Sequence, residues 1–148
     1  MWFRVFATTN EAPTAEAAGH RLQALFPGAS VSFRTDDQGW FKVSIARPGQ
    51  GSLELDRFLA SEEGIRAELN SWVAWLETRE HDPCFTRLME HVIATKQVFT
   101  IEMDAELPQI QESAVALGRF LAQQTAGIYQ VDGQGFFDMD GRLLLRED

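Results

Sequence analysis

Two stretches of this sequence contain nearly the same turn, and this repetition limits the possible folds more than any other feature. Residues 36–41 (DDQGWF) match residues 132–137 (DGQGFF), which lie 96 positions later. Asp, Gly and an aromatic residue in this order are typical of the tight turn of a β-hairpin. The flanking residues 2–46 and 97–138 both predict the order strand, helix, strand, strand. We therefore predict two βαββ halves, 2–46 and 97–146, that arose by duplication.

Alternation and helical periodicity place the elements of each half. Proline near a helix start and glycine after a helix end mark both repeat helices. In the first half, the pattern predicts strands at 2–8, 31–35 and 40–46 and a helix from Pro13 to Phe26. In the second half, it predicts strands at 98–103, 128–131 and 136–138, a helix from Pro108 to Gly127, and a final extended stretch at 143–145.

Residues 53–95 separate the two halves and predict a helical insertion. Ile65, Leu69, Trp72 and Leu76 recur at the spacing of one helix face, which predicts a helix over 62–79. A second helix is expected over 83–95, and residues 53–59 also favour a helix. We therefore predict one α+β domain over residues 1–148, with a mixed, largely antiparallel sheet. Its two βαββ halves are expected to be related by a pseudo-two-fold axis, with both repeat helices on one face.

The element order resembles the tandem βαββ arrangement of small effector-binding domains, such as gyrase-inhibitor-like and transcription-activator ligand-binding modules. The resemblance is one of topology, and the helical insertion departs from it. It implies a small, often cationic ligand that binds in the groove between the halves through aromatic side chains and a carboxylate.

The charge balance limits the possible partners. Thirteen Lys and Arg residues stand against 22 Asp and Glu residues, a net charge of −9, and no basic cluster is present. Such a chain repels phosphate backbones and anionic lipids, so we expect no nucleic acid and no membrane partner. An acidic surface suits a basic protein partner or serves solubility alone. Cys84 is the only cysteine, which excludes an intrachain disulfide and predicts a cytoplasmic protein.

Few residues have the spacing of a catalytic or metal site. His81, Cys84 and His91 come closest to a metal-ligand set, but a matching second pair of ligands is missing. We therefore expect Cys84 to contribute packing. The sequence contains no recognisable spacing of nucleophile, base and orienting residue and no phosphate-binding glycine motif. We expect no catalytic residue, no metal and no cofactor.

Strand alternation selects five candidate binding residues. Trp2, Trp40 and Phe136 are expected on the sides of their strands that face away from the repeat helices, where they would form an apolar patch. The insertion helices, a second subunit or a ligand could cover this patch. Glu102 and Asp104 alternate on one strand face, where they are either solvated or able to bind a cation or a basic partner.

These features favour a non-enzymatic binding module that recognises a protein partner, as inhibitors and immunity-type proteins do. The alternative is a small-ligand-binding domain with its site in the groove between the βαββ halves. The single apolar stripe of helix 62–79 cannot cover the whole predicted patch. We therefore also expect a two-fold homodimer with aromatic residues at its centre.

Overall fold

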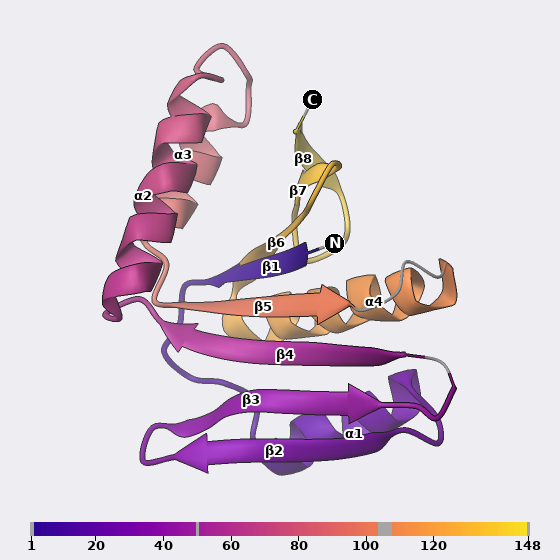
Figure 1. Ribbon diagram of the computed structural model, residues 1–148. Helices are drawn as coiled ribbons and strands as arrows, with labels where there is room; N and C mark the ends of the chain where they lie inside the picture. Colours follow the sequence, from indigo (N-terminus) through magenta and orange to yellow (C-terminus); the bar gives the residue numbers. More distant parts are fainter. Residues whose placement is uncertain (1, 50, 104–107, 148) are drawn as a thin grey trace.

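The protein folds around one wide antiparallel sheet, shown by a computed structural model that describes residues 2–49, 51–103 and 108–147. The strands follow the order β2-β3-β4-β5-β1-β6-β7-β8 across the sheet (Figure 1). This arrangement confirms the predicted α+β class and the largely antiparallel sheet. The elements in chain order are β1 (Trp2–Ala7), α1 (Ala15–Leu25), β2 (Ser30–Asp36), β3 (Gly39–Ala46), β4 (Ser52–Leu59), α2 (Glu63–Glu77), α3 (Phe85–Ile93), β5 (Gln97–Met103), α4 (Pro108–Thr125), β6 (Gly127–Val131), β7 (Gly135–Phe137) and β8 (Leu143–Arg146).

The two predicted halves share their element order but not their place in the sheet. Strand, helix, strand, strand occurs as β1-α1-β2-β3 and again as β5-α4-β6-β7, and both predicted hairpins form. However, β4, which follows the first half, lies beside β5, whereas β6 of the second half lies beside β1. A two-fold axis that exchanged β1 with β5 would also exchange β4 with β8, the strands that follow each repeat. Because β4 lies beside β5, β8 would then have to lie beside β1. The predicted pseudo-two-fold arrangement is therefore wrong.

Residues 53–59 form part of a strand, and the predicted helix there is wrong. Leu53 and Leu55 are buried beneath the repeat helices, while Glu54 and Asp56 project from the other face. This alternation has the period of a strand. Strand β4 pairs with β3 on one side and β5 on the other, so its backbone groups are satisfied in the sheet.

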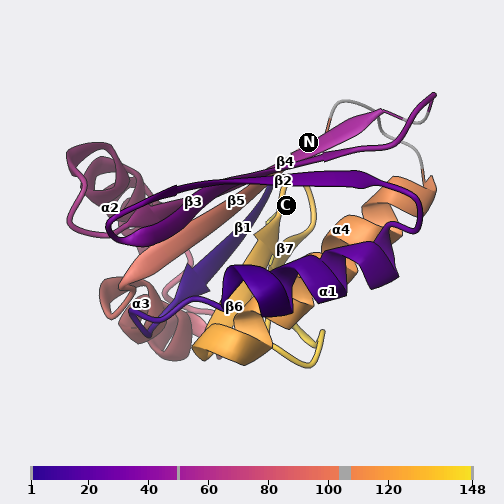
Figure 2. The same cartoon turned by 90° about the horizontal axis from the view of Figure 1, so that it is seen from below.

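One face of the sheet is covered by α1 and α4, as predicted for the repeat helices. Figure 2 shows the two helices side by side on this face. Leu22 of α1 and Leu117 and Leu121 of α4 are buried against the sheet residues Val5 and Phe99. Thr14 caps α1, because its hydroxyl accepts a hydrogen bond from the Ala17 amide at 3.1 Å.

The opposite face is covered only in part, by α2 and α3. These helices bury the side chains of the central and later strands, including Phe6, Val98 and Phe136. No helix lies in front of β2, β3 and β4 in Figure 1. We call the uncovered part of this face the open face. It consists of Trp2 on β1, Glu102 on β5, Glu54 and Asp56 on β4, Lys42 and Ser44 on β3, and Ser32 and Arg34 on β2.

The repeated turn supplies a test of the fold at two glycines of the same hairpin. Gly133 (φ +79°) and Gly135 (φ +133°) both have positive φ. A Cβ on Gly133 would meet nothing, whereas a Cβ on Gly135 would overlap the carbonyl oxygen of Leu145 on β8. We expect Gly133→Ala to lower the free energy of unfolding by about 1 kcal/mol and Gly135→Ala by at least about 3 kcal/mol. Urea denaturation measures both, and equal losses would contradict the close packing of β7 on β8.

Candidate binding face

The structure separates the three aromatic residues that were expected to form one apolar patch. The side chain of Trp40 is 4% exposed and lies under the repeat helices. Phe136 is fully buried on the opposite face, under α2. Trp2 is 36% exposed and lies at the edge of the open face. The predicted patch is therefore wrong.

A β-bulge explains the position of Trp40. Arg34 lies opposite Lys42, but the next residue, Thr35, lies opposite Trp40, so Phe41 is an extra residue in β3. The extra residue turns Trp40 to the side of Val43. The Trp40 indole Nε1–H donates a hydrogen bond to the Pro13 carbonyl at 2.7 Å, which ties β3 to the start of α1.

Phe136 is covered by an insertion helix, one of the three covers considered for the predicted patch. Its ring centroid lies 5.4 Å from that of Trp72 and 5.9 Å from that of Trp75. Among the described residues, the large apolar side chains classed as exposed are Trp2, Ile93, Met139 and Leu143. Of the three residues of the predicted patch only Trp2 is among them, so the patch on which the expected homodimer depended is not present.

The structure describes one of the two carboxylates that were predicted as binding residues on one strand face. Glu102 is exposed on the open face, directly opposite Trp2 on β1 and Glu54 on β4. Asp104 lies outside the described residues. The structure thus brings together two of the predicted binding residues, Trp2 and Glu102.

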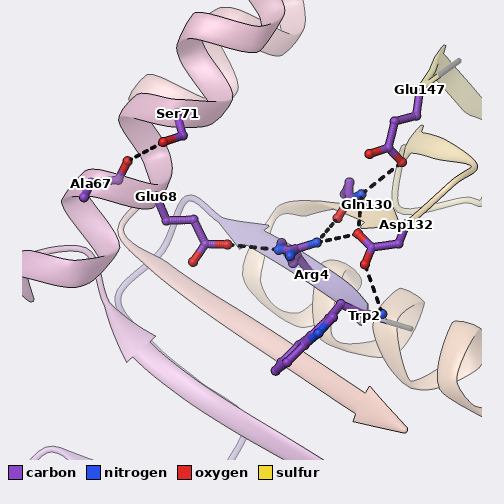
Figure 3. Close-up of polar contacts among 8 residues, drawn as sticks. All are labelled: Trp2, Arg4, Ala67, Glu68, Ser71, Gln130, Asp132 and Glu147. Carbon is purple, nitrogen blue, oxygen red and sulfur yellow. Dashed lines mark hydrogen bonds and ion pairs between the residues drawn. The ribbon is translucent and has the colours of Figure 1, made fainter.

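Arg4 organises a polar network at the border between the open face and the helix-covered part (Figure 3). Its Nε donates to Glu68 Oε1 of α2 at 2.9 Å. Its Nη1 donates to Gln130 Oε1 at 2.8 Å and to Asp132 Oδ1 at 2.7 Å. The guanidinium also lies 5.4 Å from the Trp72 ring. Sequence analysis missed this network, although an arginine between Phe3 and Val5 in an apolar strand was a signal that a partner was required.

The surroundings of Asp132 favour its ionised form. Burial alone would raise the pKa of this carboxyl, but hydrogen bonds from Arg4 and Gln130 outweigh burial and hold the pKa below its ordinary value. The backbone N–H of Trp2 also donates to Asp132, at 3.3 Å. The network therefore contains a charged carboxylate at neutral pH.

Most other carboxylates of the open face also have partners within the protein. Lys42 Nζ lies 3.3 Å from Asp56 Oδ1 and 3.7 Å from Glu54 Oε2. The Ser44 hydroxyl donates to Glu54 Oε2 at 2.8 Å. Glu102 differs, because no described residue forms an ion pair or a hydrogen bond with its carboxylate.

The hollows of the described surface do not resemble the groove implied for a small ligand. A small, partly open space lined by Phe26, Ile45 and Ile110 measures about 10 Å³, the room of roughly one water molecule. A larger, open hollow of about 460 Å³ lies between residues 10–15 and the β2–β3 hairpin. There the Arg57 guanidinium is committed to the carbonyls of Asn10 and Gln38.

The His and Cys residues weighed as metal ligands have other surroundings. His91 Nε2–H donates to the Phe6 carbonyl at 2.7 Å, and burial lowers the pKa of His91. Cys84 is the N-cap residue of α3 and is partly buried against the core on the α2–α3 side of the sheet. Within residues 2–49, 51–103 and 108–147, no group of three or more His, Cys, Asp and Glu residues could hold a metal ion. No helix of the described chain is long and apolar enough to cross a membrane.

Comparisons with protein-family models, with curated proteins and with solved structures found no match to this chain. The open face is therefore interpreted from its own geometry.

The Arg4 network predicts a pH-dependent contribution to stability. Because the pKa of Asp132 is lowered on folding, its carboxylate adds stability above the ordinary Asp pKa, and this stability is lost as the pH falls through the lower, folded value. We expect Asp132→Asn to cost about 1 kcal/mol at pH 7, since the carboxyl is partly exposed. The difference from the wild type should shrink below about pH 4. Urea denaturation from pH 7 to pH 3 measures it, and a difference that stays constant with pH would contradict this assignment.

Proposed function

We propose that this protein is a non-enzymatic binding module whose open face recognises a basic segment of another protein. The observation that carries the proposal is the row of exposed Trp2, exposed Glu102 and half-buried Glu54 on a sheet face that the protein's own helices leave uncovered. Antiparallel sheets commonly leave one face to solvent, so exposure alone does not favour binding. An exposed tryptophan beside a carboxylate that no described residue pairs with does, because interfaces are enriched in aromatic anchors surrounded by polar groups.

Charge favours a basic partner over an acidic or neutral one. The open face contains more carboxylates than cations, and the whole chain has a net charge of −9. Complementary charge steers encounter and discriminates against wrong partners. An acidic protein of this kind fits the inhibitor or immunity-like class, which blocks a basic partner by covering it. We place this binding in the cytoplasm, where a lone thiol such as that of Cys84 stays reduced.

A titration with a defined probe tests this proposal. We expect a short peptide of alternating Arg and Ser to shift the backbone amide resonances of β3, β4, β5 and β1 in ¹⁵N spectra of the wild-type protein. Binding should weaken with added salt, because both surfaces are exposed and charged. A peptide of alternating Glu and Ser is the matched control and should cause no shifts.

The proposal is wrong if the arginine peptide shifts no resonance at low salt. It is also wrong if the shifts fall on α1 and α4, since these helices cover the other face. In that second case the peptide would respond to net charge and not to the open face.

A further inference from the structure

We infer that Trp2, Glu102 and Glu54 form an anchor for a single arginine side chain of the basic partner, an inference that rests on the proposed function. The three residues lie in one row across β1, β5 and β4, because Glu102 is the register partner of both Trp2 and Glu54. Directly opposite side chains on antiparallel strands have Cβ atoms about 5 Å apart. One guanidinium can therefore reach all three.

The free protein holds two like charges opposite each other at this place. Like charges directly opposite on antiparallel strands destabilise a sheet. Glu54 is balanced by the Ser44 hydroxyl at 2.8 Å and by Lys42 at 3.7 Å. Glu102 has no such partner among the described residues. A cation seated beside Glu102 would relieve the repulsion that the sheet retains without it.

Trp2 differs from the other tryptophans of the chain. Trp40 is buried and hydrogen-bonded, and Trp72 and Trp75 pack against each other and against Phe136. The Trp2 ring contacts no other aromatic ring of the described residues and is the most exposed of the four. In Figure 3 its indole extends from β1 across the neighbouring strand β5. An exposed indole face attracts a cation and stacks well with a guanidinium.

Arginine fits this row better than lysine. A guanidinium is planar, stacks on an aromatic face and donates several N–H groups to carboxylates, whereas an ammonium is a compact, strongly hydrated charge. None of the hollows described above is lined by Trp2, Glu54 or Glu102. Small ligands require concave sites, so the arginine is expected to belong to a protein surface.

Four proteins and two peptides test the anchor. The proteins are the wild type, Glu102→Gln, Trp2→Leu and the control Glu112→Gln, which removes one charge from an exposed position on α4. One peptide has a single arginine between Gly and Ser residues, and the other has citrulline, its uncharged analogue, at that position. The readouts are the dissociation constant from ¹⁵N titration, the shift of the Trp2 indole N–H, and Tm.

We expect Glu102→Gln to weaken arginine-peptide binding about five- to tenfold and Trp2→Leu about two- to fivefold. Glu112→Gln should change it less than twofold, and the citrulline peptide should bind weakly to all four proteins. Glu102→Gln should also raise Tm, because it removes the repulsion from Glu54. A merely structural role for Glu102 would lower Tm.

The anchor is overturned if Glu102→Gln and Trp2→Leu bind the arginine peptide as Glu112→Gln does, or if the citrulline peptide binds equally well. If the alternating Arg and Ser peptide still shifts the open-face resonances in that case, the proposed function stands and only the anchor fails. If neither arginine peptide binds the wild type, both fail. A Tm lowered by Glu102→Gln would contradict the like-charge repulsion on which the anchor depends.

Discussion

Helices pack on both faces of the central strand β1. The extent to which α2 and α3 cover the second face determines which side chains of the sheet are exposed to solvent. Phe3, Val5 and Ala7 pack under α1 and α4, while Phe6 packs under α2 and α3. The first pair of helices covers its face broadly. The α2–α3 pair is shorter and buries one end of the other face, so the strands beyond it must have polar side chains there. The open face exists because α2 and α3 cover only one end of the second side of an eight-stranded sheet.

Arg4 lies at the border between the open face and the part of the sheet that α2 and α3 cover. A guanidinium beside a core is costly unless its donors are satisfied. Glu68 of α2 and Asp132 after β6 satisfy them from opposite sides. Glu147 extends the same network, because its carboxylate accepts hydrogen bonds from Gln130 and from the Gly133 amide. The network thereby fixes α2 relative to the sheet and links β1 to residues near the end of the described chain.

Short-range patterns predicted most of the fold, and the errors come from a short alternating stretch, a β-bulge and contacts distant in sequence. Period-two and period-3.6 spacing identified every described helix and every strand except β4, where Leu53 and Leu55 alternate with acids over too short a stretch. The face of Trp40 was mispredicted because one bulged residue reverses the alternation. Trp2 and Glu102 could be selected from alternation alone. The Arg4 network could not, since its partners lie 64 to 128 residues away in the chain.

The pairing of charges on the open face affects how a partner could gain affinity there. Asp56, Glu68 and Asp132 already have cations of the same protein beside them. A partner's cation that approached these carboxylates would replace an existing interaction, so the net gain would be small. Glu102 is different, because an approaching cation there would replace no ion pair or hydrogen bond from a described residue. In the proposed complex, electrostatic affinity would thus be concentrated at one point of an acidic surface, and specificity would come from whether a partner's cation meets that point and the Trp2 ring together. The paired carboxylates would contribute long-range attraction and leave the discrimination to this single row.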